Sequence, residues 1–379
     1  MKFPWTLVTL MVTICLLAVS KKTNAYPLNS DMDIKSNLAE EAIKSRLQTL
    51  DLPFAVEYTE EVNSLIQRYA VAGYKGTQHI LGRSVLYFPI FEHYLKVYDL
   101  PIQLKYLPIV ESRLRPQATS SVGAAGLWQF MPVTAKQYKL KINEYLDERR
   151  DPYKSTEAAV KMLSDLYEQF EDWSLVLAAY NCGPGRVRKA IRYAGCNNFW
   201  EIRKFLPQET QKYVPAFIAA AYIENFYSLH DLAPNYPTMA MQNTRTVITH
   251  QYMAFRDIAY KCSISEEILT ALNPSYVKGV IPTSYTGNYV ILPKKAVKDF
   301  KAYDAKLAKK SVAAITAAPY GTFLTHHVVN PGERIETLAK NYHCSIAEIV
   351  AWNELRKPEV VVGQELTLYL SKNIFIPRP

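Results

Sequence analysis

The chain is poor in the residues that build metal sites and disulfide scaffolds. Its 379 residues include five cysteines and seven histidines. None of the cysteines shows the C-x2-C spacing of a structural zinc site. We expect neither a metal nor a cofactor. Four cysteines follow the first 25 residues. An oxidising compartment leaves two alternatives open for them, namely four free thiols or a bridge between Cys182 and Cys196.

After its first 20 residues the sequence also lacks an apolar run that could cross a bilayer, which takes about 20 residues. At the N-terminus, Lys2 precedes an apolar run from Trp5 to Val19, and the small residue Ala25 follows. This pattern is typical of a secretory signal peptide, here residues 1–25. We therefore predict an exported protein, soluble or held at a membrane surface. An uncleaved anchor and lipidation at Cys15 stay open as alternatives.

Dense blocks of one charge are missing as well. The formal net charge is +9, and three of the lysines lie in the predicted signal peptide. Such a mild basic excess does not favour nucleic acid as a partner. It fits a neutral or anionic polymer.

Strand-like alternation is absent between about residues 34 and 230. In this region apolar residues recur every three or four positions, and prolines and short polar stretches separate the segments. The sequence therefore predicts an all-α domain, with helices in EEAIKSRLQTL, EEVNSLIQRYAV, FPIFEHYLKVY, STEAAVKMLSDLYEQF, WSLVLAAY and TQKYVPAFIAAAYIENFY.

An internal repeat replaces this pattern from about residue 240. Residues 255–273 align without a gap with residues 335–353, and each copy has the pattern strand, helix, helix, strand. We predict two small βααβ modules, at 244–296 and 324–371, joined by an Ala/Lys-rich linker at 297–323.

The repeat resembles LysM, a module that binds glycans containing N-acetylglucosamine. The second copy carries VVNPGERIETLA and IVAWN, which are similar to the family's V-x-x-G-D-T-L-x-x-I-A and L-x-x-x-N. The first copy is degenerate, with Tyr252 where the second has Gly332. Whether this copy binds glycan is left open by the sequence. Two purely structural modules without a ligand are the alternative.

One acid, Glu111, stands in the otherwise acid-free run PIVESRLRPQATSSVGAAGLWQFMP (108–132). It lies at the end of a helix that we expect to begin at Pro101, and its neighbours are apolar. Apolar surroundings raise the pKa of a carboxyl group, which suits a general acid near neutral pH. Small residues in the loop that follows let the backbone approach a bulky ligand. A surface glutamate at a helix end is the alternative interpretation.

Four segments together resemble the goose-type lysozyme-like family of lytic murein transglycosylases. The family pattern is E-S near a helix end, then A-x-S-x-x-G-A-x-G-L-W-Q-F-M-P, then A-Y-N-x-G-x-G, then E-T-x-x-Y-V. The upstream residues and DERRDP are also similar to the membrane-bound lytic transglycosylase D subgroup, in which LysM units follow the catalytic domain. The resemblance covers nearly all of the chain after residue 25. It implies an all-α lysozyme-like catalytic domain at 26–236, with an N-terminal helical extension. The four segments stand at Glu111-Ser112, Ala118 to Pro132, Ala179 to Gly185 and Glu209 to Val214.

The same resemblance implies a reaction that needs one carboxyl group. Glu111 would protonate the glycosidic oxygen between N-acetylmuramic acid and N-acetylglucosamine in peptidoglycan. It would then deprotonate the muramoyl 6-hydroxyl, giving a 1,6-anhydromuramoyl end without water. A hydrolytic muramidase and an inactive peptidoglycan-binding scaffold remain the alternatives. The substrate-binding residues implied by the motifs are Ser120, Gln129, Met131, Tyr180 and Asn181; loop capping and core packing are the alternatives for the first three.

The resemblance also implies a place of action and a partner. We expect a monomer in the periplasm of a Gram-negative bacterium, bound to the glycan strands of peptidoglycan. Peripheral association with the outer membrane or the cell wall stays open. The sequence does not decide between endo- and exo-action, nor does it give a peptide-stem preference.

Overall fold

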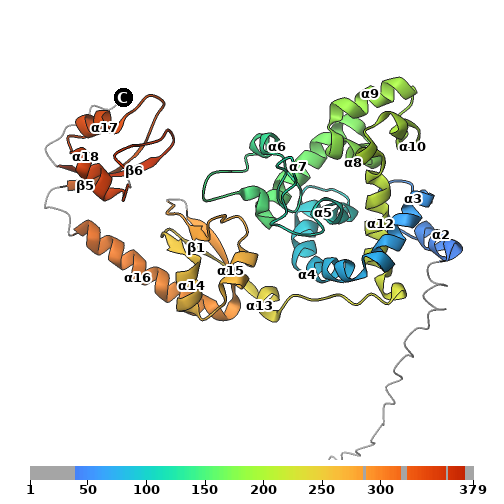
Figure 1. Ribbon diagram of the computed structural model, residues 1–379, viewed down its shortest axis with the longest axis horizontal. Coiled ribbons are helices and arrows are strands. Elements are labelled where there is room, and N and C mark those ends of the chain that lie inside the picture. The colour runs from blue at the N-terminus through green and yellow to red at the C-terminus, as the bar shows by residue number, and fades with distance from the viewer. Residues whose placement is uncertain (1–38, 285–286, 317–321, 356, 372–379) are drawn as a thin grey trace, which may run out of the picture. The chain divides into compact units, whose positions relative to one another are not determined.

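The computed structural model describes residues 39–284, 287–316, 322–355 and 357–371 (Figure 1). The predicted signal peptide, with Cys15, lies outside these residues. Contacts divide the chain into two units. Unit 1 comprises residues 1–114 and 159–236, and unit 2 comprises residues 115–158 and 237–379. Helix α7 (Pro152–Phe170) begins in unit 2 and continues into unit 1.

Unit 1 is helical throughout its described elements, as the sequence predicts. Its centre is α12 (Tyr213–Phe226), which is buried over nearly its whole length and contacts α3, α5 and α8. A helix that is apolar on every side belongs inside a core. Side chains cap the N-termini of its neighbours, because Thr59 accepts from the Val62 amide at α3 and Asp172 from the Leu175 amide at α8. The remaining bounds are α2 (Glu40–Gln48), α3 (Glu60–Gln67), the π-helical η1 (Arg68–Ala72), α4 (Tyr74–Val97), η2 (Ile102–Tyr106), α5 (Leu107–Ser112), α8 (Trp173–Cys182), α9 (Pro184–Ala194), α10 (Phe199–Ile202), η4 (Arg203–Phe205), α11 (Gln208–Gln211) and η5 (Tyr227–His230).

Unit 2 contains the two predicted modules, and their strand–helix–helix–strand order is confirmed. In the first module β1 pairs antiparallel with β4, and a short β2–β3 pair is added. In the second module β5 pairs antiparallel with β6. The bounds in unit 2 are α6 (Pro132–Gln137), η3 (Glu148–Arg150), α13 (Met239–Gln242), β1 (Thr244–Thr249), β2 (Met253–Ala254), α14 (Phe255–Cys262), α15 (Glu266–Leu272), β3 (Val280–Ile281), β4 (Asn288–Pro293), η6 (Lys294–Ala296), α16 (Val297–Thr316), β5 (Thr322–Val328), α17 (Ile335–Asn341), α18 (Ile346–Trp352) and β6 (Glu365–Ser371).

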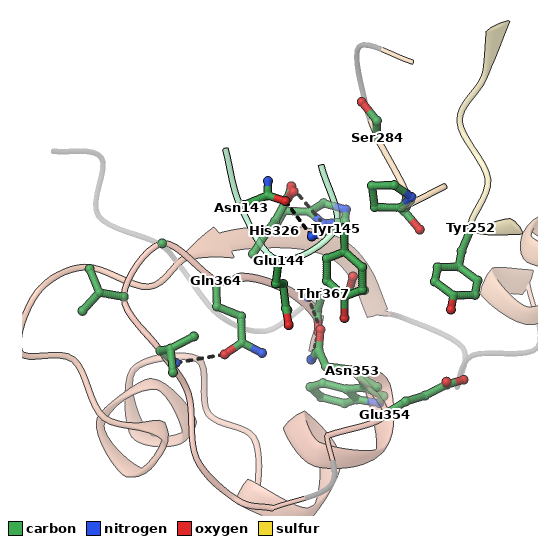
Figure 2. Close-up of a pocket in the computed structure, with 17 residues that line it drawn as sticks. Asn143, Glu144, Tyr145, Tyr252, Ser284, His326, Asn353, Glu354, Gln364 and Thr367 are labelled. Carbon is green, nitrogen blue, oxygen red and sulfur yellow. Dashed lines mark hydrogen bonds and ion pairs between the residues drawn. The ribbon is translucent and has the colours of Figure 1, made fainter. Parts of the chain in front are cut away.

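One asparagine closes each module in the same way. Asn273 follows α15; its Oδ1 accepts from the Ile291 amide at 2.8 Å and its Nδ2 donates to the Ile291 carbonyl at 2.8 Å. Asn353 follows α18 and makes the same two bonds with Thr367, at 2.6 and 2.8 Å (Figure 2). Both asparagines therefore satisfy a strand amide and carbonyl from one side chain, which ties the second helix to the last strand.

The stretch predicted as a linker, 297–323, begins as a regular helix. Its N-terminal part packs on the first module, where Phe300 is buried in one cluster with Phe255 and Leu292. Residues 317–321 lie outside the described part of the chain. The first module is thus larger than the repeat alone indicates.

The four cysteines of the described residues are free thiols, so the bridge between Cys182 and Cys196 does not form. Cys182 ends α8 and Cys196 lies beyond α9. An eleven-residue helix rises about 16 Å, whereas a disulfide needs Cα atoms within about 7 Å. The spacing in sequence allowed the bridge, and the intervening helix prevents it.

No helix in the described ranges combines the length and apolar character required to cross a bilayer. The same ranges hold no group of three or more histidine, cysteine, aspartate or glutamate side chains arranged to bind a metal ion.

Candidate active site

Glu111 lies in the last turn of α5, a short helix that continues the 3-10 turn η2. The helix stops because Arg113 and Leu114 both adopt left-handed backbone angles, with φ of 55° and 56°. Arg83 fixes this end, since its Nη2 donates to the Arg113 carbonyl at 2.9 Å. The end of the helix that carries Glu111 is therefore held by contacts within unit 1.

Glu111 is half-buried, and its carboxyl group has one strong partner. The hydroxyl of Tyr213, the first residue of α12, donates to Glu111 Oε1. Burial raises the pKa of Glu111 to about 7; the Tyr213 hydrogen bond lowers it by less, and the charge of Glu209 raises it further. Near neutral pH the group thus populates both the acid and its conjugate base.

Tyr213 remains a hydrogen-bond donor in this pair. It is 5% exposed, and burial together with the nearby Glu111 charge raises the pKa of its hydroxyl well above the usual value. The proton therefore stays on the phenol oxygen at any pH at which the protein works. Its hydrogen bond orients one carboxylate oxygen and stabilises the ionised form of Glu111.

Tyr180 and Asn181 end α8, just before the turn at Gly183, whose φ is +88°. Tyr180 lies close enough to Tyr213 to raise the pKa of that hydroxyl. Asn181 Oδ1 accepts from the Thr210 hydroxyl at 2.7 Å. Unit 1 therefore gathers Glu111, Tyr213 and Tyr180, and it holds Asn181 through Thr210.

Ser120 and Gln129 stabilise the loop that carries them. Ser120 Oγ accepts from the Ala124 amide at 3.0 Å, and the Ser120 amide donates to the Ala124 carbonyl at 2.9 Å. Gln129 has a φ of 49°, and its Nε2 donates to the Gly126 carbonyl at 2.8 Å. Loop capping, an alternative left open by the sequence, therefore describes the contacts of both side chains.

Met131 differs from these two residues because its side chain is 40% exposed. It stands at the N-terminus of α6, directly before Pro132. Core packing therefore does not account for Met131.

Gly126 sits where a side chain cannot fit. Its φ is +87°, and a Cβ atom there would lie 1.7 Å from the Arg149 carbonyl oxygen. Next to it, Trp128 is fully buried and its Nε1 donates to the Thr156 hydroxyl at 2.9 Å. The Gly-Leu-Trp-Gln-Phe run is thus packed tightly against the segment around residue 149.

Sequence reasoning missed Tyr213 and Thr210 as site residues. Both belong to the quoted E-T-x-x-Y-V motif, but no role followed from that motif alone. Thr210 is 1% exposed and Tyr213 is 5% exposed. The available signal was two hydroxyl side chains in a motif that leads into an apolar helix, because a hydroxyl that becomes buried has to find a partner.

Three family models match separate parts of the chain. Residues 89–203 match the transglycosylase SLT domain. Residues 243–309 match the LysM-like domain described for lytic transglycosylase MltD, and residues 327–368 match the LysM domain.

Curated relatives of the chain include two lytic transglycosylases of Escherichia coli. Membrane-bound lytic murein transglycosylase D of Escherichia coli K12 is 33% identical over 291 residues, which cover 72% of this chain and 61% of the relative. Soluble lytic murein transglycosylase of the same strain is 34% identical over 169 residues, covering 42% of this chain and 26% of the relative. The chain thus spans less than two thirds of the length of these relatives.

Among solved structures, an inactive mutant of lytic transglycosylase Slt from Pseudomonas aeruginosa is 20% identical. The match covers 55% of this chain and 39% of that one, with a TM-score of 0.34.

From the family matches, the chain carries a transglycosylase SLT domain followed by a LysM-like domain of the lytic transglycosylase D type and a LysM domain.

Proposed function

We propose that the chain is a lytic transglycosylase that cleaves the β-1,4 bond between N-acetylmuramic acid and N-acetylglucosamine in peptidoglycan. The observation that carries the proposal is Glu111, a half-buried residue whose carboxyl group has a pKa of about 7 and accepts a hydrogen bond from Tyr213. It lies inside the part of the chain that matches the SLT domain.

In this proposal Glu111 performs both proton transfers. Its protonated form donates to the glycosidic oxygen as the bond to the anomeric carbon breaks, and the 2-acetamido group of the substrate stabilises the positive centre. The carboxylate then removes the proton from the muramoyl 6-hydroxyl, whose oxygen attacks that carbon. The proton lost in the first step is regained in the second, and no water is consumed. The Tyr213 hydroxyl donates a hydrogen bond to Oε1 of Glu111, so we assign the proton transfers to Oε2.

The other predicted site residues divide into two groups under this proposal. Tyr180 supports the Glu111–Tyr213 pair, and Asn181, held by Thr210, binds sugar hydroxyl or N-acetyl groups. Ser120 and Gln129 act through the shape of their loop, since their side chains bond within it. Exposed Met131 is assigned to contact with the sugar chain.

A hydrolytic muramidase is the second candidate, and one observation favours considering it. Hydrolysis ordinarily uses a second carboxylate, and Glu209 is the acid whose charge reaches Glu111. Under the hydrolase alternative Glu209→Gln would abolish turnover. Under the transglycosylase proposal the same substitution lowers the pKa of Glu111 and leaves turnover near neutral pH within a few-fold.

The remaining parts fit the same function. We propose that export follows from residues 1–25 and that the chain acts as a monomer in the periplasm, at the cell wall or the inner face of the outer membrane. The glycan strands of peptidoglycan are the proposed partner, and the second LysM module is the proposed glycan-binding part. The domain boundaries at 26–236, 244–296, 297–323 and 324–371 stay predictions.

Mass spectrometry of the products tests the proposal directly. Purified peptidoglycan is digested with the full chain, and the ends of the released fragments are weighed. Anhydro ends, lighter by one water than reducing ends, support the transglycosylase. Reducing ends favour the muramidase, and the absence of released fragments favours the scaffold.

A further inference from the structure

Residues of the first LysM-like module bond to a segment about 130 residues earlier in the chain. The Val277 amide donates to the Tyr145 carbonyl at 3.0 Å, and the Asp147 amide donates to the Ser275 carbonyl at 2.8 Å. Between these bonds, Leu146 and Tyr276 form an antiparallel bridge. All of these residues belong to unit 2. Residues 145–147, which we call the strip, thus pair with the module as an added edge strand would.

Apolar packing and a buried acid strengthen the same junction. Leu146 packs against the core cluster of the module. The Tyr289 hydroxyl on β4 donates to Asp151 Oδ2, and Asp151 is 4% exposed. Burial and the Asp151 charge raise the pKa of Tyr289, so this phenol stays a donor. A hydrogen bond from a buried donor to a charged group is among the stronger single contacts in a protein.

Asp151 uses its other oxygen at the start of α7. Its Oδ1 accepts from the amides of Tyr153 and Lys154, both at 3.0 Å, as an N-cap does. The side chain therefore joins β4 of the module to the first turn of a long helix. On the surface, Lys278 adds an ion pair to Glu144 at 2.8 Å.

Two arginines that follow the strip, Arg149 and Arg150, hold the loop 117–131. Arg149 Nη1 donates to the Gly123 carbonyl at 2.8 Å, while Asp147 fixes its guanidinium group through bonds of 2.9 and 2.8 Å. Arg150 donates to the Gln117 carbonyl and to the Thr119 hydroxyl, each at 2.9 Å. Asp147 thus connects the module to the loop. Its amide bonds to the module, and its carboxylate orients Arg149, which holds the loop.

We propose that the first LysM-like module is a positioning element for the loop 117–131, and that Tyr289 and Asp151 are positioning residues for the reaction. The module fixes the strip and Asp151, these fix Arg149 and Arg150, and the two arginines fix the loop that carries Ser120, Gln129 and Met131. The effect on turnover rests on the proposed function, whereas the effect on the loop does not.

A comparison of the two copies indicates that this role belongs to the first copy and is distinct from glycan binding. In the alignment of the two copies, Tyr289 corresponds to Glu365. Glu365 lies near His326 of its own module, with Nδ1 and Oε1 3.8 Å apart. The first copy therefore presents a phenol donor to Asp151 at a position where the second copy has an acid.

Tyr289→Phe tests the proposal in the full chain, because it removes the hydroxyl and keeps the ring. Tyr260→Phe is the matched control, since Tyr260 lies on α14 of the same module and is 80% exposed. Asp151→Asn is the second variant; asparagine is as good an N-cap as aspartate, so the helix start is kept. Two quantities are measured, namely hydrogen exchange of the amides in 117–131 and kcat/KM on soluble glycan chains.

We expect Tyr289→Phe to speed exchange of the loop amides by about tenfold, the loss associated with a hydrogen bond to a buried charged group. We expect kcat/KM to fall by a similar factor at temperatures well below unfolding. The double variant Tyr289→Phe/Asp151→Asn should be no worse than the stronger single variant, because the two residues form one interaction. A purely structural role would lower the melting temperature and leave loop exchange unchanged at the assay temperature.

Loop exchange in Tyr289→Phe that matches Tyr260→Phe within twofold overturns the proposal. If the wild-type chain releases no anhydro product, the proposed function fails, yet exchange still decides the positioning role. A second pair tests the backbone contact independently: Val277→Pro removes the amide that bonds to Tyr145, whereas Val277→Ala keeps it. Only the proline variant should loosen the loop, and equal exchange in the two variants counts against the proposal.

Discussion

Glu111 and Glu224 are two carboxyl groups of unit 1 whose pKa burial raises to the same value, about 7. Glu111 accepts from Tyr213 at the start of α12, and Glu224 lies eleven residues later on the same helix, about 16 Å along its axis. Glu224 lines a small hollow with Phe88 and Tyr227. Its Oε1 is enclosed and, among the described residues, has no hydrogen-bond partner.

The difference between the two groups shows that a perturbed pKa alone does not identify a catalytic acid. Both carboxyls resist ionisation for the same reason, which is desolvation. At Glu224 the charge of Lys105 and a hydrogen bond with Ser84 lower the pKa in part, but Oε1 is left without a partner among the described residues. At Glu111 the Tyr213 hydroxyl, itself buried, orients one oxygen and stabilises the carboxylate once its proton has left. Orientation by a fixed donor is what general acid–base catalysis requires in addition to a matched pKa.

The largest expected effect comes from replacing each acid with its amide. Glu111→Gln should lower turnover of peptidoglycan by about 10⁴-fold or more, because both proton transfers are lost. Glu224→Gln, the matched control, should stay within about threefold of wild type. Release of anhydro products measured by mass spectrometry decides the comparison, and equal losses in the two variants would remove Glu111 from its special role.

Tyr213→Phe tests the donor that distinguishes the two sites. The hydrogen bond lowers the pKa of Glu111, so its removal should raise that pKa and move the basic limb of the pH–rate profile upward. We also expect kcat to fall by about tenfold, since the carboxylate loses its orientation and one charge-assisted bond. Tyr227→Phe, at the hollow of Glu224, should leave the profile in place. If the basic limb of the Tyr213→Phe profile moves to lower pH, the assignment of Tyr213 as the donor to Glu111 is contradicted.

The pH dependence of the free energy of unfolding should show the property that the two carboxyl groups share, which is a raised pKa in the folded state. Each carboxyl has a folded pKa raised from 4.5 to about 7. Its contribution to stability is therefore complete below about pH 4.5 and is lost as the pH rises through 7. Glu224→Gln should raise the melting temperature at about pH 8.5 and change it little at about pH 5. The gain is at most about 3 kcal/mol, and a larger gain at the lower pH would reverse the sign that we expect.

The smallest expected effect is the coupling between the two sites. Glu111→Gln and Glu224→Gln should add in the free energy of unfolding to within about 0.5 kcal/mol, because distant sites without shared partners are independent. Chemical denaturation of the two single variants and the double variant at one alkaline pH provides the measurement. A coupling above about 1 kcal/mol would show that α12 transmits strain between the two acids.

Of the two acids compared, only Glu111 could be singled out from the sequence. The apolar neighbours of Glu111 predicted its raised pKa, because apolar side chains next to it in the chain also enclose it in space. Helical periodicity predicted the helices of unit 1, and the offset of the repeat predicted both modules. These features are local or periodic, so a single sequence contains them.

The remaining features depend on contacts between distant segments. Tyr213 reaches Glu111 across 102 residues, and Tyr289 reaches Asp151 across 138. Glu224 reads in sequence as an ordinary acid near the end of a helix, and its burial became visible only when α4 was placed beside it. Likewise, the loop contacts of Ser120 follow from backbone geometry that the motif alone does not specify.

The asparagines that close the two modules differ in chemical ageing. Asparagine deamidates when the backbone nitrogen of the next residue attacks the side-chain carbonyl carbon. Asn273 precedes Pro274, whose nitrogen carries no hydrogen, so this route is blocked in the first module. Asn353 precedes Glu354, and the route is chemically open there. Deamidation would turn the donor to the Thr367 carbonyl into a negatively charged acceptor, so old protein would lose the closure of its second module before that of its first.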